Sequence, residues 1–251
     1  MTGTLINIAT VILGGSLGLI FGARFPERVR QTVIAGLGLF TAGIGIQMFL
    51  STKNPIIVLG SLLIGGLLGE WWQIEARLKG LGGYLERRFT GSDMENAAQG
   101  TIESGEDGHV PAGSRFIRGF LTASLVFCVG PMTILGSIND GLTGDYRLLA
   151  IKSILDGFGA LAFSSTLGIG VLFSVLIIFI YQGGITFLAA QAQALITPDM
   201  MAEMTAAGGL LLLGIAISSL LEIKNIRVGN FLPALVVAPL IVAILALIGV
   251  R

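Results

Sequence analysis

The chain has 251 residues, of which 53% are hydrophobic and only 12% are charged, and its formal net charge is zero. Because a soluble domain averages about 25% charged residues, this composition excludes an ordinary soluble protein, and the zero net charge removes the electrostatic basis for nucleic-acid binding. Apolar runs of about 20 residues recur along the chain, each long enough to cross a ~30 Å hydrocarbon core as a helix. We therefore predict an all-α, polytopic transmembrane bundle of eight spans, with seven as the alternative count, in a single membrane domain over residues 1–251.

The first part of the chain contains three predicted spans, which cover residues 5–21, 32–50 and 56–72. The first span carries Gly14, Gly18 and Gly22 at four-residue spacing. Small residues on one helix face let two backbones approach closely, so this face is predicted to pack against another helix, with a substrate-facing groove as the alternative. Asn7 in the same span is either a helix-to-helix hydrogen bond or a site group.

The segment after the third span is polar and is predicted to be cytoplasmic. Residues 73–90 combine apolar residues at helical spacing with basic side chains, which is typical of an interfacial amphipathic helix. Residues 91–114 are polar, acidic and rich in Gly and Ser without periodicity, so we predict a disordered loop there. Together these form an interfacial helix and a loop, 73–115, inserted in the membrane domain.

The second part of the chain contains five predicted spans, which cover residues 118–138, 148–165, 167–188, 206–221 and 228–250. Gly130 and Pro131 interrupt the first of these, because proline removes an amide donor and clashes with the preceding turn of a helix. The intervening residues 189–205 are predicted to form a short helix on the membrane surface, with Thr197 at a helix start. If the chain does not turn near Gly168, only seven spans remain and the second half is inverted.

The basic residues of the loops set the predicted orientation. For eight spans, one side holds eleven Lys and Arg residues and the other holds three, so the first side is predicted to be cytoplasmic and the N-terminus to lie outside. The inner residues are Arg24, Arg28, Arg30, Arg77, Lys79, Arg87, Arg88, Arg115, Arg118, Lys224 and Arg227. The outer residues are Lys53, Arg147 and Arg251.

Two segments of the chain resemble each other. Ala35–Asn54 and Ala206–Asn225 share nine of twenty residues at a constant offset, including a Lys-Asn pair at the end of each. With eight spans, the two hairpins that contain these segments face opposite sides of the membrane, which predicts an inverted repeat of the kind found in transporters. The alternative is a duplicated packing unit without transport.

Most of the ionisable groups in apolar sequence fall between residues 126 and 166. Lys152 and Asp156 are four residues apart and therefore share a helix face. Because charges within the membrane are costly, such residues mark a pathway or a buried structural pair. The candidate pathway residues are Asn139, Asp140, Asp145, Lys152 and Asp156. The 139–145 run lacks the spacing and the distal glutamate of an EF-hand, so we predict an entrance or an ordinary turn rather than a calcium site.

Catalytic chemistry finds little support in the sequence. The single histidine, His109, lies in the polar loop, and the single cysteine, Cys128, lies in an apolar segment. One cysteine excludes an intrachain disulfide and a cysteine-based metal cluster. We therefore expect no enzyme, no catalytic residue, no metal site and no cofactor.

Several motifs along the chain look familiar in combination: GGSLG, RFPER, GIGIQ, GSINDGLTGD, KSILDGFGA, SSTLGIG, TPDMMAEMTAAGGLLLLG and NFLPAL. Together they resemble the bacterial membrane family labelled domain of unknown function 554, the YqgA/YdfK-like proteins. The resemblance covers nearly the whole chain except the 91–114 loop. It implies a multi-pass protein of the bacterial cytoplasmic (inner) membrane, and it brings no established activity.

Two functions of different classes follow from these patterns. The first is a transporter or channel for a small solute or ion, with its site between the fourth and fifth spans. The alternative is a non-transporting membrane scaffold or regulator that holds a partner through residues 73–115. The expected partners are the lipid bilayer and a small solute or ion, and a homo-oligomer is left open.

Overall fold

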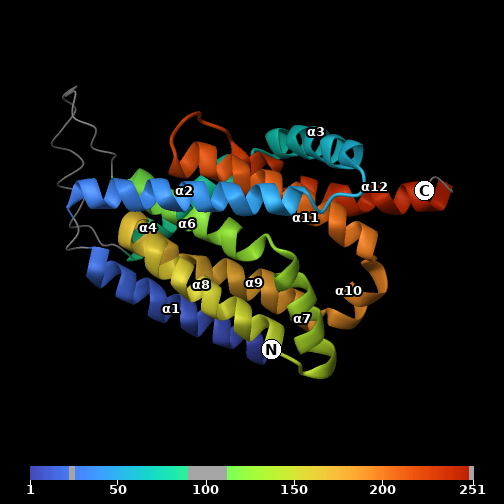
Figure 1. Ribbon diagram of the computed structural model, residues 1–251, viewed down its shortest axis with the longest axis horizontal. Helices are drawn as coiled ribbons and strands as arrows, with labels where there is room; N and C mark the ends of the chain where they lie inside the picture. The colour runs from blue at the N-terminus through green and yellow to red at the C-terminus, as the bar shows by residue number, and fades with distance from the viewer. Residues whose placement is uncertain (23–25, 90–111, 249–251) are drawn as a thin grey trace.

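The computed structural model describes residues 1–22, 26–89 and 112–248, and all regular structure in these residues is helical (Figure 1). The α-helices are α1 (Thr2–Gly22), α2 (Glu27–Phe49), α3 (Pro55–Trp72), α4 (Ile74–Phe89), α6 (Ala112–Cys128), α7 (Pro131–Thr143), α8 (Arg147–Leu167), α9 (Ser174–Phe187), α10 (Ala189–Leu195), α11 (Pro198–Ile215) and α12 (Ala234–Ile248). Two 3₁₀-helices, η2 (Ile169–Phe173) and η4 (Val228–Phe231), and a π-helix, η3 (Ala216–Leu220), join or extend them. The predicted all-α class is confirmed.

Seven helical segments within the described residues are long and apolar enough to cross a membrane. They are α1, α2, α3, α8, η2 with α9, α11 with η3, and η4 with α12. The pair α6–α7 passes the same test as one broken span, with a bend of 61° between its two parts. The bend lies at Gly130, which is extended, and Pro131 occupies the first turn of α7, where a missing amide donor costs no hydrogen bond.

The direction of the helices shows how often the chain crosses the bundle. Helices α1 and α8 run parallel, since Gly3 lies against Leu149 and Gly14 against Gly157. Helix α9 runs antiparallel to α1, so the chain turns between α8 and α9 at Gly168, whose φ of +82° favours glycine. Because α8 starts at the same end of the bundle as α1, the bent pair α6–α7 carries the chain from one end to the other (Figure 1). Within the described residues, this arrangement corresponds to eight crossings when the bent pair is counted as one.

The glycine face predicted on α1 packs against α8. A Cβ atom at Gly14, Gly18 or Gly22 would overlap the backbone of Gly157, Leu161 or Ser165 on α8. These three pairs keep the same sequence offset, so the two helices stay in contact over at least eight residues of α1. Close backbone approach of this kind supplies packing energy where lipid gives no hydrophobic drive for association.

Helices α2, α3, α11 and α12 form a second group. Helices α2 and α11 run in opposite directions and approach closely at Gly45 and Gly209, and α3 and α12 meet at Gly65 and Ala234. The similar segments 35–54 and 206–225 lie mainly on α2 and α11. The inverted repeat between the two hairpins stays a prediction.

The structure corrects the predicted boundaries of residues 189–205. A short helix, α10, is present, but α11 already begins at Pro198 instead of residue 206. The side chain of Thr197 accepts a hydrogen bond from the amide of Met200, which satisfies one of the open donors at this helix start. The polar residues at the start of α11 lower its apparent hydropathy, so the sequence pattern placed the span too late.

The predicted segments 73–90 and 91–114 have different outcomes. Residues Ile74–Phe89 form helix α4, which agrees with the helical spacing of the predicted interfacial helix. Most of the predicted disordered loop, 91–111, lies outside the described residues. Its last three residues belong to α6, which begins at Ala112, six residues before the predicted span.

Glu203 on α11 holds the turn between α2 and α3. It is 1% exposed, and its carboxylate accepts hydrogen bonds from the Thr52 hydroxyl and from the amides of Lys53 and Asn54, at 2.6 to 2.9 Å. These bonds satisfy backbone donors that α3 itself cannot satisfy. The turn between α2 and α3 is therefore fixed to α11.

We expect the Glu203→Ala substitution to lower the free energy of unfolding by about 1–3 kcal/mol, because three part-buried donors lose the charged acceptor that they share. Equilibrium unfolding in mixed detergent micelles measures this change. The control is Asp199→Ala, which breaks only the exposed ion pair with Lys53 and should cost less than about 1 kcal/mol. Equal effects of the two substitutions would contradict the role of Glu203.

Candidate functional site

Lys152 and Asp156 form an ion pair inside the bundle. They lie one turn apart on α8, and the Lys152 ammonium donates a hydrogen bond to Oδ2 of Asp156. Their side chains are 8% and 10% exposed. At 1.5 Å per residue, Asp156 lies about 13 Å along α8 from its first residue. The pair therefore lies well inside a span, where unpaired charges would be strongly unfavourable.

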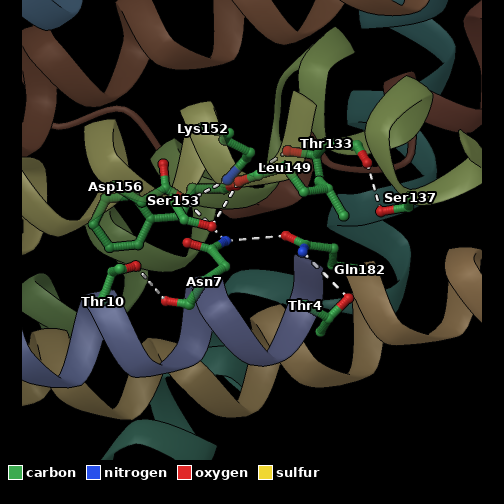
Figure 2. Close-up of polar contacts among 11 residues, drawn as sticks. Thr4, Asn7, Thr10, Thr133, Ser137, Leu149, Lys152, Ser153, Asp156 and Gln182 are labelled. Carbon is green, nitrogen blue, oxygen red and sulfur yellow. Dashed lines mark hydrogen bonds and ion pairs between the residues drawn. The ribbon is translucent and has the colours of Figure 1, made fainter. Parts of the chain in front are cut away.

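Two other helices complete the surroundings of the pair (Figure 2). The Asn7 side-chain amide on α1 donates to Oδ2 of Asp156 at 3.0 Å and to Oε1 of Gln182 on α9 at 3.0 Å. Gln182 in turn donates to the Thr4 hydroxyl at 3.2 Å. Asn7 and Gln182 are fully buried. A continuous polar chain thus links α8, α1 and α9, which we call the buried polar cluster: Thr4, Asn7, Lys152, Asp156 and Gln182.

The bent pair α6–α7 adjoins the buried polar cluster. Phe127, near the end of α6, lies against Gly159 on α8, and Gly136 on α7 lies against Leu149. The bent pair therefore flanks the turns of α8 that carry Lys152 and Asp156. Just beyond the bend, the Thr133 hydroxyl donates to the carbonyl of Phe127, and the Ser137 hydroxyl donates to the carbonyl of Thr133. These side-chain bonds satisfy carbonyls near the interrupted helix, as is usual for broken helices at membrane depth.

The other predicted pathway residues lie outside this cluster. Asp140 on α7 is buried and accepts a hydrogen bond from the amide of Gly3, so it satisfies the start of α1. Asn139 is exposed. Asp145 lies in the turn before α8 and binds Arg147 through two side-chain hydrogen bonds. The structure thus brings together two of the five residues, Lys152 and Asp156.

Asp145 is also a poor proton acceptor. The Arg147 guanidinium beside it lowers the pKa of the Asp145 carboxyl to about 2. A lowered pKa means that the carboxylate stays ionised at neutral pH, and that its interaction with Arg147 is lost only as the pH falls towards 2. Asp145 therefore stays charged in the physiological range.

The buried polar cluster is closed in this structure. Neither of the two cavities described between the helices is lined by Lys152 or Asp156. One acceptor, Oδ1 of Asn7, is buried without a hydrogen-bond partner. The cluster thus has a free acceptor beside an ion pair, and Lys152 and Asp156 are only 6% and 8% exposed.

Three members of the cluster were not predicted as pathway residues. Asn7 was assigned to either packing or a site, and the structure places it in contact with Asp156. The sequence gives only one weak indication that Gln182 and Thr4 belong to a site, which is that each is a polar residue within an apolar run. Nothing in their spacing identifies the helix that they face.

Metal binding has no obvious basis in the described ranges, where no three His, Cys, Asp or Glu side chains lie together. The polar groups of the cluster are one ammonium, one carboxylate, two amides and a hydroxyl. Such groups can pair with a small ion or exchange a proton. They do not form a nucleophile with an adjacent base.

The fold and the buried cluster define a multi-pass α-helical membrane protein. The family model described as protein of unknown function (DUF554) matches residues 2–243, and the chain belongs to this family. The predicted membership is confirmed.

Two relatives of the chain are described as uncharacterised proteins. The uncharacterized membrane protein YdfK of Bacillus subtilis is 30% identical over 255 residues, which covers all of both chains. The uncharacterized protein YqgA of Escherichia coli is 36% identical over 237 residues, or 94% of each chain. No solved structure matches the chain. The relatives support a membrane protein and name no activity.

Proposed function

We propose that the protein moves a small solute or ion across the bacterial cytoplasmic membrane, with Lys152 and Asp156 as the charged residues of the pathway. One observation carries the proposal. A charged pair lies buried within a span, and it accepts a hydrogen bond from the Asn7 amide on α1, which is itself bonded to Gln182 on α9. Apolar residues of similar volume would pack at such a position at equal or lower free energy. Charges in this position are therefore best explained by a function that needs them.

The bent pair α6–α7 gives the proposed pathway a means of opening. Transporters commonly place their sites beside discontinuous helices, whose halves can move separately. Here the bent pair flanks the turns of α8 that carry Lys152 and Asp156, and both of these side chains are buried in this structure. We infer that movement of α7 against α8 exposes the pair. The predicted inverted repeat supports the same class of function.

The proposed orientation places the N-terminus outside. The starts of α2 and α6 and the ends of α1, α3, α8 and α11 share one end of the bundle (Figure 1). The basic residues of the sequence concentrate in the loops at this end. By the positive-inside rule this end is cytoplasmic.

Flux through the purified protein in proteoliposomes tests the proposal, with proton, Na⁺ and K⁺ gradients as separate probes. We expect wild-type protein to dissipate at least one gradient and Asp156→Asn to abolish that flux, because asparagine keeps the shape but loses the charge. Asp199→Asn, which alters an exposed carboxylate paired with Lys53 outside the buried polar cluster, should leave the flux unchanged. The absence of flux for all three ions would contradict transport of a monovalent cation. Full flux in the Asp156→Asn variant would contradict the assignment of the pathway to the buried polar cluster.

The scaffold alternative depends on residues 73–115, and most of that segment lies outside the described residues. It makes a different prediction from transport. Deleting residues 91–111 should leave the flux unchanged if the pathway lies in the buried polar cluster. A deletion that removes a cellular function without altering flux would support the scaffold instead.

A further inference from the structure

A cavity of about 510 Å³ lies away from the buried polar cluster, at the end of the bundle that holds most basic residues. Its walls come from α4, α6, η3, η4 and the loop that joins η3 to η4. This volume falls in the range of sites that bind small molecules. The cavity shares no residue with the buried polar cluster.

The cavity has an apolar side and a charged side. Ile117, Leu121 and Leu125 place one apolar face of α6 along it, and Ile215 adds to this lining from α11. Arg118, Lys79, Glu75 and Glu222 supply the charges. Arg118 pairs with Glu222, and Lys79 pairs with Glu75. A ligand for this cavity must therefore offer an apolar part and a charged part.

Two residues that line the cavity each have a buried donor atom without a hydrogen-bond partner. These atoms are Nε of Arg118 and the hydroxyl of Thr122, one turn further along the same face of α6. Thr122 is 1% exposed. Buried donors without acceptors cost free energy, so an acceptor bound beside them would be stabilised. Because Glu222 engages the Arg118 guanidinium at only one nitrogen, the remaining N–H groups can bind an anionic head group.

The backbone opposite α6 is irregular. Residues Ala216–Leu220 form a π-helix, a conformation that occurs frequently at functional sites. Glu222 has a φ of +53°, which is unfavourable for a residue with a side chain. The Ser218 hydroxyl accepts from the amide of Ile226 and donates to its carbonyl, which fixes the loop over the π-helix.

We propose that this cavity binds an anionic amphiphile, a phosphate or carboxylate head group on an alkyl chain. Arg118 and Thr122 bind the head group, and the apolar face of α6 contacts the chain. Basic pockets between helices on the cytoplasmic side of membrane proteins bind anionic lipids by the same physical means. Glu222 competes with the ligand for Arg118. The proposal is independent of transport through the buried polar cluster.

Ligand titration of the full-length protein in neutral detergent, followed by native mass spectrometry, tests this site. The probes are short-chain phosphatidylglycerol, short-chain phosphatidylcholine and inorganic phosphate. We expect one saturable phosphatidylglycerol per chain and weaker binding of the other two probes. Arg118→Gln should weaken phosphatidylglycerol binding about tenfold or more. Glu222→Gln should strengthen it, because it removes the competing carboxylate. Lys224→Gln, at an exposed base of the same loop, should change nothing.

Leu121→Trp provides a second variant that keeps the Arg118–Glu222 pair and fills the apolar side. It should prevent phosphatidylglycerol binding even if Arg118→Gln fails to fold. Equal binding of phosphatidylcholine, equal binding of inorganic phosphate, or unchanged phosphatidylglycerol binding in the Arg118→Gln or Leu121→Trp variant would overturn the assignment. Binding that Glu222→Gln weakens would also overturn it.

Discussion

Asp156→Leu alone should lower the free energy of unfolding by about 3–5 kcal/mol, whereas the double variant Lys152→Met/Asp156→Leu should recover most of that loss. The single change leaves the Lys152 ammonium buried without its partner, at 8% side-chain exposure. The double change removes both charges and keeps an apolar volume between α8 and its neighbours. Asn7 keeps Gln182 as an acceptor in both variants. Equilibrium unfolding in mixed micelles measures the three proteins under one condition.

Asp145→Leu is the matched control for the single variant. Asp145 also pairs with a basic residue, Arg147, but Asp145 lies in the turn before α8, Arg147 is the first residue of α8, and both are more exposed. Breaking this exposed pair should have little effect on stability, because solvent screens both charges. A single Asp156→Leu variant as stable as Asp145→Leu would mean that the pair is solvated. A double variant no more stable than the single one would mean that the charges themselves stabilise the bundle.

The second large effect is expected at the contact of α1 with α8. Gly14→Ala should destabilise the bundle by about 2 kcal/mol or more, because the new methyl group overlaps the backbone of Gly157 and the two helices must separate. Separation would also disturb Asn7, which lies two turns earlier on α1 and binds Asp156. Thermal unfolding in detergent measures the loss of stability.

Gly43→Ala is the control for this substitution. A Cβ atom at Gly43 meets nothing within 4 Å, and the residue also lies in the interior of a helix. Alanine there should be neutral or stabilise by up to about 1 kcal/mol through helix propensity. Equal destabilisation at Gly14 and Gly43 would show that the α1–α8 contact is looser than the structure has it.

The sequence was sufficient for features that depend on one helix at a time. Spans such as α1 and α3 were predicted to within a few residues, because their apolar length and caps are local properties. The four-residue spacing of Lys152 and Asp156 predicted their pairing, and that of Gly14 and Gly18 predicted a packing face. Each of these inferences needs only the helical period.

Contacts between helices could not be predicted from hydrophobic length and helical spacing. Asn7 forms hydrogen bonds with Asp156, which lies 149 residues further along the chain, and with Gln182, which lies 175 residues further along. Helical periodicity shows which residues share a face, but it does not show which helix that face meets. Glu203 is a similar case, because its bonds to the turn at Lys53 follow from the packing of α11 against α2.

The sequence around the cavity beside α6 gave even less indication that a cavity would form there. Arg118 looked like one more base at the end of a span, and Thr122 looked like an ordinary polar residue in an apolar run. The π-helix that faces them depends on how the segment after α11 packs, since neither proline nor glycine occurs in Ala216–Leu220. The shape of this region is therefore set by tertiary packing rather than by local propensity.

Flux measured on the Lys152→Met/Asp156→Leu double variant tests the central claim most directly. This variant should fold like the wild-type protein, so any loss of flux reports on the charges and not on stability. If the pair forms part of the pathway, proteoliposomes with the double variant should fail to dissipate the ion gradient that the wild-type protein dissipates. Wild-type flux through the folded double variant would contradict the account and leave Lys152 and Asp156 with a structural role alone.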